Sequence, residues 1–171
     1  MFLFSQLCGL IVSVAAITSM QLKNIKWILV CQLICNGIGA LSYILLGGLS
    51  GCGIYLVALA QSIIYYFFRV RNKKAPIVLS IAFLCAYLIC SATTFKSSID
   101  FISALAALSC ALSIMQEKPS LYRVFMLLNG AIWMIYDMGV GAYTMIISHI
   151  ATTLSAAVGI IRLDIKKDVK S

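Results

Sequence analysis

The amino-acid sequence predicts an all-α membrane protein with seven transmembrane helices, arranged as two parallel three-helix bundles joined by a linker helix. Three observations support this prediction. Hydrophobic residues make up 63% of the chain and charged residues 11%, whereas soluble domains are about half apolar and a quarter charged. Seven apolar runs are separated by short polar segments, and a bilayer-spanning helix needs about 20 such residues. Finally, part of the first half of the sequence recurs in the second half.

The composition excludes several classes of protein. A soluble domain of 171 residues cannot bury this much apolar surface, which argues against a soluble enzyme, a nucleic-acid-binding domain and an appended globular module. The lipid bilayer is the expected partner, and the net charge of +8 is expected to reflect basic cytoplasmic loops. The seven cysteines form no CxxC pair and no Cys/His set with metal spacing. We therefore expect no metal and no cofactor.

The polar segments delimit the helices in order. No basic residue precedes the first run, Phe2–Met20, so we expect a retained helix and not a cleaved signal peptide. Glycines at 47–51 indicate a turn, Pro76 stands where proline favours a helix start, and a polar tail begins at Arg162. The six later runs are Trp27–Leu46, Cys52–Phe68, Ile77–Phe95, Phe101–Met115, Leu121–Val140 and Ala142–Ile161.

The distribution of basic residues predicts the orientation in the membrane. With seven spans, Lys96 is the single basic residue on one face. The opposite face carries Lys23, Lys26, Arg69, Arg71, Lys73, Lys74, Lys118, Arg123, Arg162, Lys166, Lys167 and Lys170. Because Lys and Arg are enriched in cytoplasmic loops, we expect the N-terminus outside and the C-terminus in the cytoplasm.

An internal repeat organises the chain. When the sequence is shifted by 93 positions, residues 36–74 fall on 129–167 without a gap, and both copies carry Asn-Gly-x5-Tyr and Arg-x3-Lys-Lys. A three-span unit reverses its orientation and one further span restores it, so two such units would run parallel. We therefore divide the single transmembrane domain, 1–171, into a first repeat (1–74), a linker helix (75–100) and a second repeat with the cytoplasmic tail (101–171).

This plan resembles that of the SWEET and PQ-loop superfamily of small transporters, which have parallel repeats. The chain more closely resembles the YgjV family of bacterial inner membrane proteins. The similarity lies in Gln6-x2-Gly9, Leu45-x-Gly47, the stretch 141–146 (Gly-Ala-Tyr-Thr-Met-Ile) and Ile160-Ile161-Arg162. The superfamily resemblance implies movement of a substrate by alternating access, with a site between the two bundles. The chain lacks the helix-interior prolines of those relatives, since Pro76 and Pro119 both stand at helix starts.

Two asparagines are the first candidates for a substrate site. Asn36 and Asn129 are equivalent in the repeat, and each lies about 12–14 Å from the cytoplasmic end of its span. Trp133 and Tyr136 share a helical face with Asn129, and Tyr43 shares one with Asn36. An amide beside aromatic rings suits a small polar solute. The alternative is that both Asn–Gly pairs bond neighbouring helices where glycine allows close packing.

Three further polar residues complete the candidate list. Gln61 is expected to line the first bundle. His149, the one histidine of the chain, is a candidate for proton coupling because its charge changes near neutral pH. Asp137, near the outer end of its span, is its expected partner. The alternative is a neutral His149 bonded to a helix carbonyl and an Asp137 that reaches the headgroups.

The sequence favours a transporter of a small polar solute and keeps two alternatives. A membrane receptor or accessory subunit could use the same fold, and a closed apolar interface between the bundles would favour it. An intramembrane enzyme is disfavoured because the spans offer no nucleophile–base pair. The sequence leaves the solute, the coupling ion and the oligomeric state open, with a homo-oligomer as one alternative.

Overall fold

The computed structural model describes residues 2–45, 49–95, 99–140 and 143–165. These residues form seven α-helices, the last of which continues into a short π-helix, so the expected number of helices is confirmed for the described part of the chain. The helices are α1 (Phe2–Gln21), α2 (Ile25–Leu45), α3 (Leu49–Val70), α4 (Ile77–Thr94), α5 (Asp100–Met115), α6 (Pro119–Val140) and α7 (Tyr143–Gly159), followed by η1 (Ile160–Ile165).

Two predicted boundaries were wrong. Helix α3 already begins at Leu49, so Ser50 and Gly51, which the sequence assigns to a turn, are helical. An apolar environment leaves the backbone no alternative to internal hydrogen bonds, so a glycine there does not end a helix. At the other end, η1 carries helical structure past Arg162 to Ile165, because Asp164 is held in an ion pair with Arg123.

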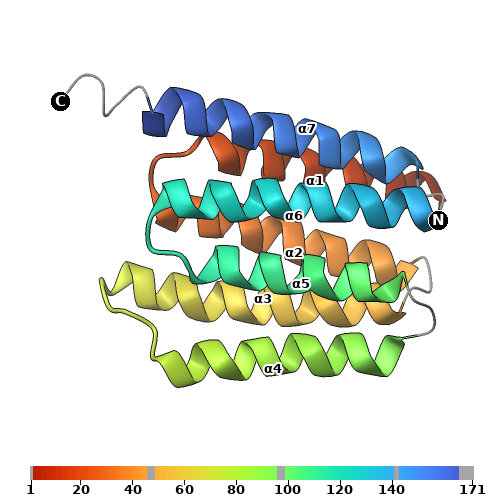
Figure 1. Cartoon of the computed structure of the whole chain (residues 1–171), viewed down its shortest axis with the longest axis horizontal. Helices are drawn as coiled ribbons and strands as arrows, with labels where there is room; N and C mark the ends of the chain where they lie inside the picture. The colour runs from red at the N-terminus through yellow and green to blue at the C-terminus, as the bar shows by residue number, and fades with distance from the viewer. Residues whose placement is uncertain (1, 46–48, 96–98, 141–142, 166–171) are drawn as a thin grey trace.

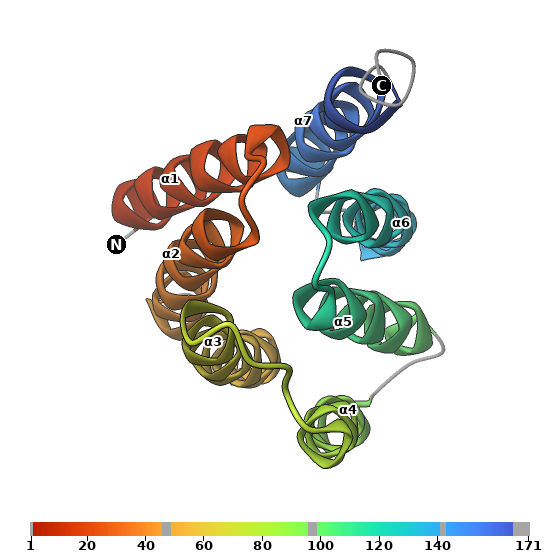
Figure 2. The ribbon, with the colours of Figure 1, turned by 90° about the vertical axis from the view of Figure 1, so that its left-hand side faces the viewer.

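The helices lie side by side along the long axis of the molecule (Figure 1). In the end view, α1, α2 and α3 form one row and α5, α6 and α7 form a second row that faces it (Figure 2). Helix α2 contacts α1 and α3, and α6 contacts α5 and α7. The rows meet where α1 contacts α7 and where α3 contacts α5. Helix α4 lies outside both rows and packs against α3 and α5.

The described surface is more apolar than that of a soluble protein, and several uncharged polar side chains are buried beside the hydrophobic clusters of the interior. Large apolar side chains point outward, and Ile77 and Ile147 are 73% and 70% exposed. Asn36, Gln61 and Asn129, in contrast, are buried. In water such a surface would be unfavourable, whereas lipid accepts apolar side chains and disfavours unpaired polar ones.

Length and composition alone identify two described segments that can cross a membrane, Cys52–Val70 and Ile146–Ile165. The shorter apolar helical segments are Cys8–Gln21, Ile25–Leu41, Ile77–Thr93 and Phe101–Met115.

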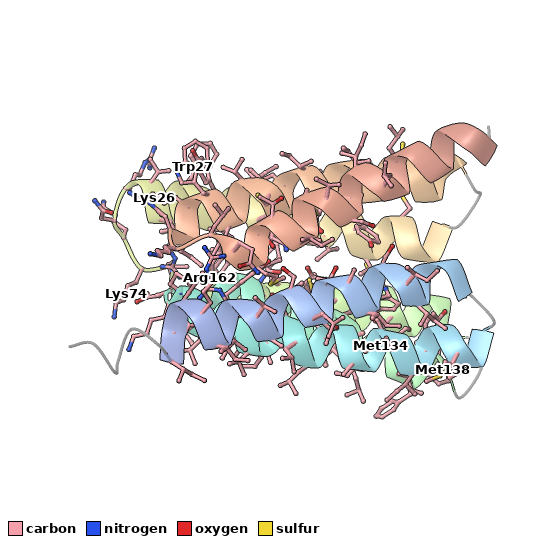
Figure 3. All side chains as sticks on the ribbon, turned by 90° about the horizontal axis from the view of Figure 1, so that it is seen from above. Lys26, Trp27, Lys74, Met134, Met138 and Arg162 are labelled. Carbon is pink, nitrogen blue, oxygen red and sulfur yellow. The ribbon has the colours of Figure 1, made fainter. Side chains whose placement is uncertain are left out.

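Basic side chains gather at one end of the molecule. Lys26, Lys74 and Arg162 lie at the end where η1 finishes, whereas Met134 and Met138 lie toward the opposite end (Figure 3). Trp27, also at the basic end, is 61% exposed, as is common for tryptophans at a membrane interface.

Two buried arginines at the basic end join the two rows of helices. Arg123 of α6 donates from Nε to the carbonyl oxygen of Met20 at 2.7 Å and pairs through Nη1 with Asp164 at 2.7 Å. This clamp crosses the contact between α1 and α7.

The second clamp crosses the contact between α3 and α5. Arg69 of α3 donates from Nη2 to the carbonyl oxygen of Met115 at 3.0 Å and pairs through Nη1 with Glu117 at 3.3 Å. Each arginine therefore binds a carbonyl that the end of a helix leaves without an intrahelical partner. We call these two sets of contacts the arginine clamps.

Candidate functional site

A cavity of about 170 Å³ lies between the two rows, and residues from all seven helices line it. Its lining combines amides, hydroxyls and aromatic rings with small apolar side chains. The polar and aromatic members are Ser13, Gln32, Asn36, Tyr55, Tyr87, Asn129, Trp133, Ser148, His149 and Thr152. A mostly apolar cavity with a few placed polar groups is the usual form of a small-molecule site.

The two repeat-related asparagines both reach this cavity, from the middle of α2 and of α6. Asn36 donates from Nδ2 to Ser62 Oγ of α3 at 3.1 Å. Asn129 donates from Nδ2 to the carbonyl oxygen of Ala106 at 2.6 Å and to Ser109 Oγ at 2.9 Å, both on α5. Both asparagines therefore bond to a neighbouring helix and also line the cavity.

The equivalence of the two asparagines does not extend to their partners. Asn36 binds the helix that follows its own, whereas Asn129 binds the helix that precedes its own. Ser155, the repeat equivalent of Ser62, donates to the carbonyl oxygen of Ile17 at 3.1 Å and accepts from Gln21 at 3.0 Å. Ser155 thus connects α7 to α1 and does not bond to Asn129, which bonds to α5.

Trp133 forms the aromatic part of the wall. Its ring stacks on the ring of His149, with the centroids 5.8 Å apart and the planes 5° from parallel. Tyr136 meets the Trp133 ring edge-on at 5.4 Å but does not itself line the cavity. The structure therefore brings His149 against Trp133, and the pair presents a flat surface from α6 and α7.

The other predicted site residues lie elsewhere. Gln61 is fully buried and does not line the cavity, because its Nε2 donates to the carbonyl oxygen of Ala111 and its Oε1 accepts from Tyr87, both at 3.1 Å. The side chains of Tyr43 and Asp137 lie outside the described residues. The coupling of His149 to Asp137 stays a prediction.

Sequence reasoning missed Gln32, Tyr55 and Tyr87. Gln32 stands one helical turn before Asn36, so its spacing carried a signal. Tyr87 belongs to α4, which lies outside both copies of the repeat. No pattern in the sequence predicted that its side chain lines the cavity. Through Tyr87 and its bond to Gln61, α4 contributes to the wall between the rows.

Comparison with known protein families gives a match, which covers nearly the whole chain. The model of one family, described as bacterial inner membrane protein, matches residues 3–167. No curated protein and no solved structure matches the chain.

Proposed function

Because the chain belongs to the Imp-YgjV family of bacterial inner membrane proteins, we propose that it transports a small polar organic solute across that membrane by alternating access. The observation that carries the proposal is the cavity between the rows, which Asn36 and Asn129 reach from the middle of α2 and α6. Repeat-built transporters place their substrate sites at this depth and at the interface of the repeats. A closed apolar interface between the rows would favour a receptor or accessory subunit, whereas the described cavity lining includes polar side chains from both rows.

The proposal includes the arrangement of the helices. We assign α1–α3 and α5–α7 to the two parallel repeats and α4 to the linker, as the resemblance to SWEET transporters implies. The contact of α1 with α7 supports this assignment, because exchanging the repeats turns it into the contact of α5 with α3, which is also present. Relative movement of the two rows would then open the cavity alternately to the two sides.

The proposal also includes the orientation. All seven helices cross the membrane, the end that carries Lys26, Lys74 and Arg162 faces the cytoplasm, and the N-terminus lies outside. The charge asymmetry of the sequence supports this orientation.

Uptake into proteoliposomes tests the proposal even though the solute has not been identified. Liposomes with purified protein are incubated with an isotope-labelled extract of polar bacterial metabolites, washed, and analysed by mass spectrometry. We expect at least one neutral polar metabolite to accumulate above its level in protein-free liposomes. Asn129→Ala should lower this accumulation about tenfold, because a lost hydrogen bond to the solute costs about 1.4 kcal/mol.

Leu128→Ala is the matched control, since Leu128 neighbours Asn129 on α6 but is 49% exposed on the outer face. It should leave the uptake unchanged. Absence of accumulation over protein-free liposomes would contradict transport. Equal uptake by wild type and Asn129→Ala would contradict the site and leave transport standing.

A further inference from the structure

The cavity lining shows which hydrogen-bonding groups remain for a ligand. Both N–H groups of the Asn129 amide have a hydrogen-bond acceptor within the protein, on Ala106 and Ser109. The amide nitrogens of Asn36 and Gln32 likewise donate, to Ser62 and to the hydroxyl of Tyr122. An amide has two N–H donors and one carbonyl acceptor, so these bonds orient the three side chains.

The three amide carbonyl oxygens are the groups left over. No described residue donates a hydrogen bond to Oδ1 of Asn36, Oδ1 of Asn129 or Oε1 of Gln32, and all three side chains line the cavity. Two of them come from the first row and one from the second. The polar surface that the amides offer to a ligand is therefore one of acceptors.

Among the residues that the structure describes, the lining of the cavity also lacks charged side chains, which favours an uncharged ligand. The described lining contains no Asp, Glu, Lys or Arg, and His149 is its one imidazole. The two clamp arginines are paired at the basic end, outside the lining. An ion that entered the cavity would lose its hydration without gaining a fixed counter-charge, which is unfavourable in an apolar environment.

The size of the cavity limits the ligand further. Its volume of about 170 Å³ is close to that of an engineered protein cavity of about 150 Å³ that takes up benzene. The stacked rings of Trp133 and His149 add a flat wall on one side. A molecule with a single substituted ring or a short polyol therefore fits, whereas a disaccharide does not.

We propose that this cavity selects an uncharged molecule of about one ring in size that donates at least two hydrogen bonds, to the carbonyl oxygens of Asn36, Asn129 and Gln32. This inference rests on the proposed function, because it concerns the same cavity. It names the chemical class of the solute, a neutral compound with hydroxyl or amide N–H groups. Molecules of equal shape that lack donors or carry a charge are rejected.

Four probes of nearly equal shape test the inference by equilibrium binding. Benzamide is neutral and donates two hydrogen bonds, acetophenone is neutral without donors, benzoate is an anion and benzamidinium is a cation with donors. Binding to the protein in lipid nanodiscs is measured by saturation-transfer NMR, with empty nanodiscs as the blank. We expect benzamide to bind, and the other three to bind at least about tenfold more weakly, because an unpaired buried acceptor or charge disfavours each complex.

Two variants connect the selectivity to the named atoms. Asn36→Ala removes one of the three carbonyl acceptors and should lower the ratio of benzamide affinity to acetophenone affinity by about fivefold, the effect of one hydrogen bond. Gln116→Ala removes an amide at the end of α5 that does not line the cavity and should leave their ratio unchanged. If Asn36→Ala does not fold, the comparison of the four probes on the wild-type protein decides alone.

The inference is overturned if acetophenone, benzoate or benzamidinium binds as tightly as benzamide, or if none of the four binds above the blank. Because binding is measured without flux, these results are separate from those of the uptake experiment. Transport of a charged metabolite together with equal binding of the probes would remove the selectivity and keep the transporter. Selective binding of benzamide without uptake of any metabolite would keep the selectivity and identify a receptor.

Discussion

At the scale of single residues, glycines that look alike in the sequence differ in their surroundings. A Cβ added at Gly37 would meet only Leu59 Cδ1, at 3.9 Å. A Cβ at Gly130, its repeat equivalent, would collide with Thr153 Oγ1. At Gly159, where α7 crosses the end of α1, an added Cβ would lie 2.6 Å from the carbonyl oxygen of Met20. An added Cβ thus meets a side chain at Gly130, the backbone at Gly159 and only an ordinary contact at Gly37.

Substitution of two of these glycines tests this distinction. Gly159→Ala should lower the free energy of unfolding by about 2 kcal/mol, because backbone atoms cannot yield to the new methyl group as a side chain can. Gly37→Ala should leave it unchanged or raise it by up to about 1 kcal/mol, because alanine favours a helix over glycine. Unfolding by titration with SDS, followed by circular dichroism, gives both values. Equal effects of the two changes would contradict the close approach of α1 and α7.

At the scale of the helices, the arginine clamps fasten the two rows to each other at one end. The side chain of Arg123 is 1% exposed and that of Asp164 is 22% exposed. Arg123 also holds the carbonyl oxygen of Met20. The second clamp uses Arg69, whose repeat equivalent, Arg162, is exposed at the surface. Equivalent positions in the repeat therefore do not perform equivalent structural roles, and Arg123 takes the place that the repeat would assign to Arg162.

The prediction at this scale compares the buried arginine with the exposed one. Arg123→Leu should destabilise the protein by about 3 kcal/mol, because it leaves Asp164 and the end of α1 without their donor. Arg162→Leu should change the stability by no more than about 0.5 kcal/mol, since surface substitutions away from such contacts have small effects. SDS-induced unfolding of both variants measures the difference. A small effect of Arg123→Leu would show that the clamp contributes little to joining the rows.

At the scale of the whole molecule, the proposed orientation in the bilayer rests on the separation of charged and apolar surface. The outward faces of the helices are apolar and the exposed basic side chains gather at one end. Within the described residues, the segment that joins α3 to α4 carries Arg71, Lys73 and Lys74, all exposed. In the proposed orientation, their position beyond the ends of the helices keeps their charges out of the hydrocarbon core.

Limited proteolysis checks the orientation without altering the chain. Trypsin added to inverted inner-membrane vesicles should cleave between α3 and α4, at the basic residues 71–74. Trypsin added to intact spheroplasts should leave this segment uncut, because the proposed orientation places it in the cytoplasm. Spheroplasts opened with detergent serve as the control that the site is cleavable. Cleavage in intact spheroplasts would reverse the proposed orientation.

The sequence specified most of the fold because burial in lipid imposes a simple rule on it. Apolar runs of sufficient length become helices, so the seven helices of the described residues were predictable. Helix ends were predicted less well, since Ser50 and Gly51 are helical and Asp164 is held by a distant arginine. Periodicity and the repeat placed Asn36, Asn129 and Trp133, which do line the cavity. The repeat could not place Tyr87, because α4 has no counterpart in it.

By itself, the sequence determined that the chain is helical and apolar, that all its basic residues but Lys96 fall on one side of a seven-span arrangement, and that two amides lie halfway along their helices. These are properties of hydropathy and spacing within single helices. Only the tertiary structure decided that Gln61 bonds to α4 and α5 and does not line the cavity. It also decided that the Asn129 amide donates to α5, and that Arg123, not Arg162, bonds across the contact of α1 with α7. The reason is physical: a buried polar group bonds to whichever partner packing brings within reach, and neighbours on different helices are not encoded in the periodicity of either one.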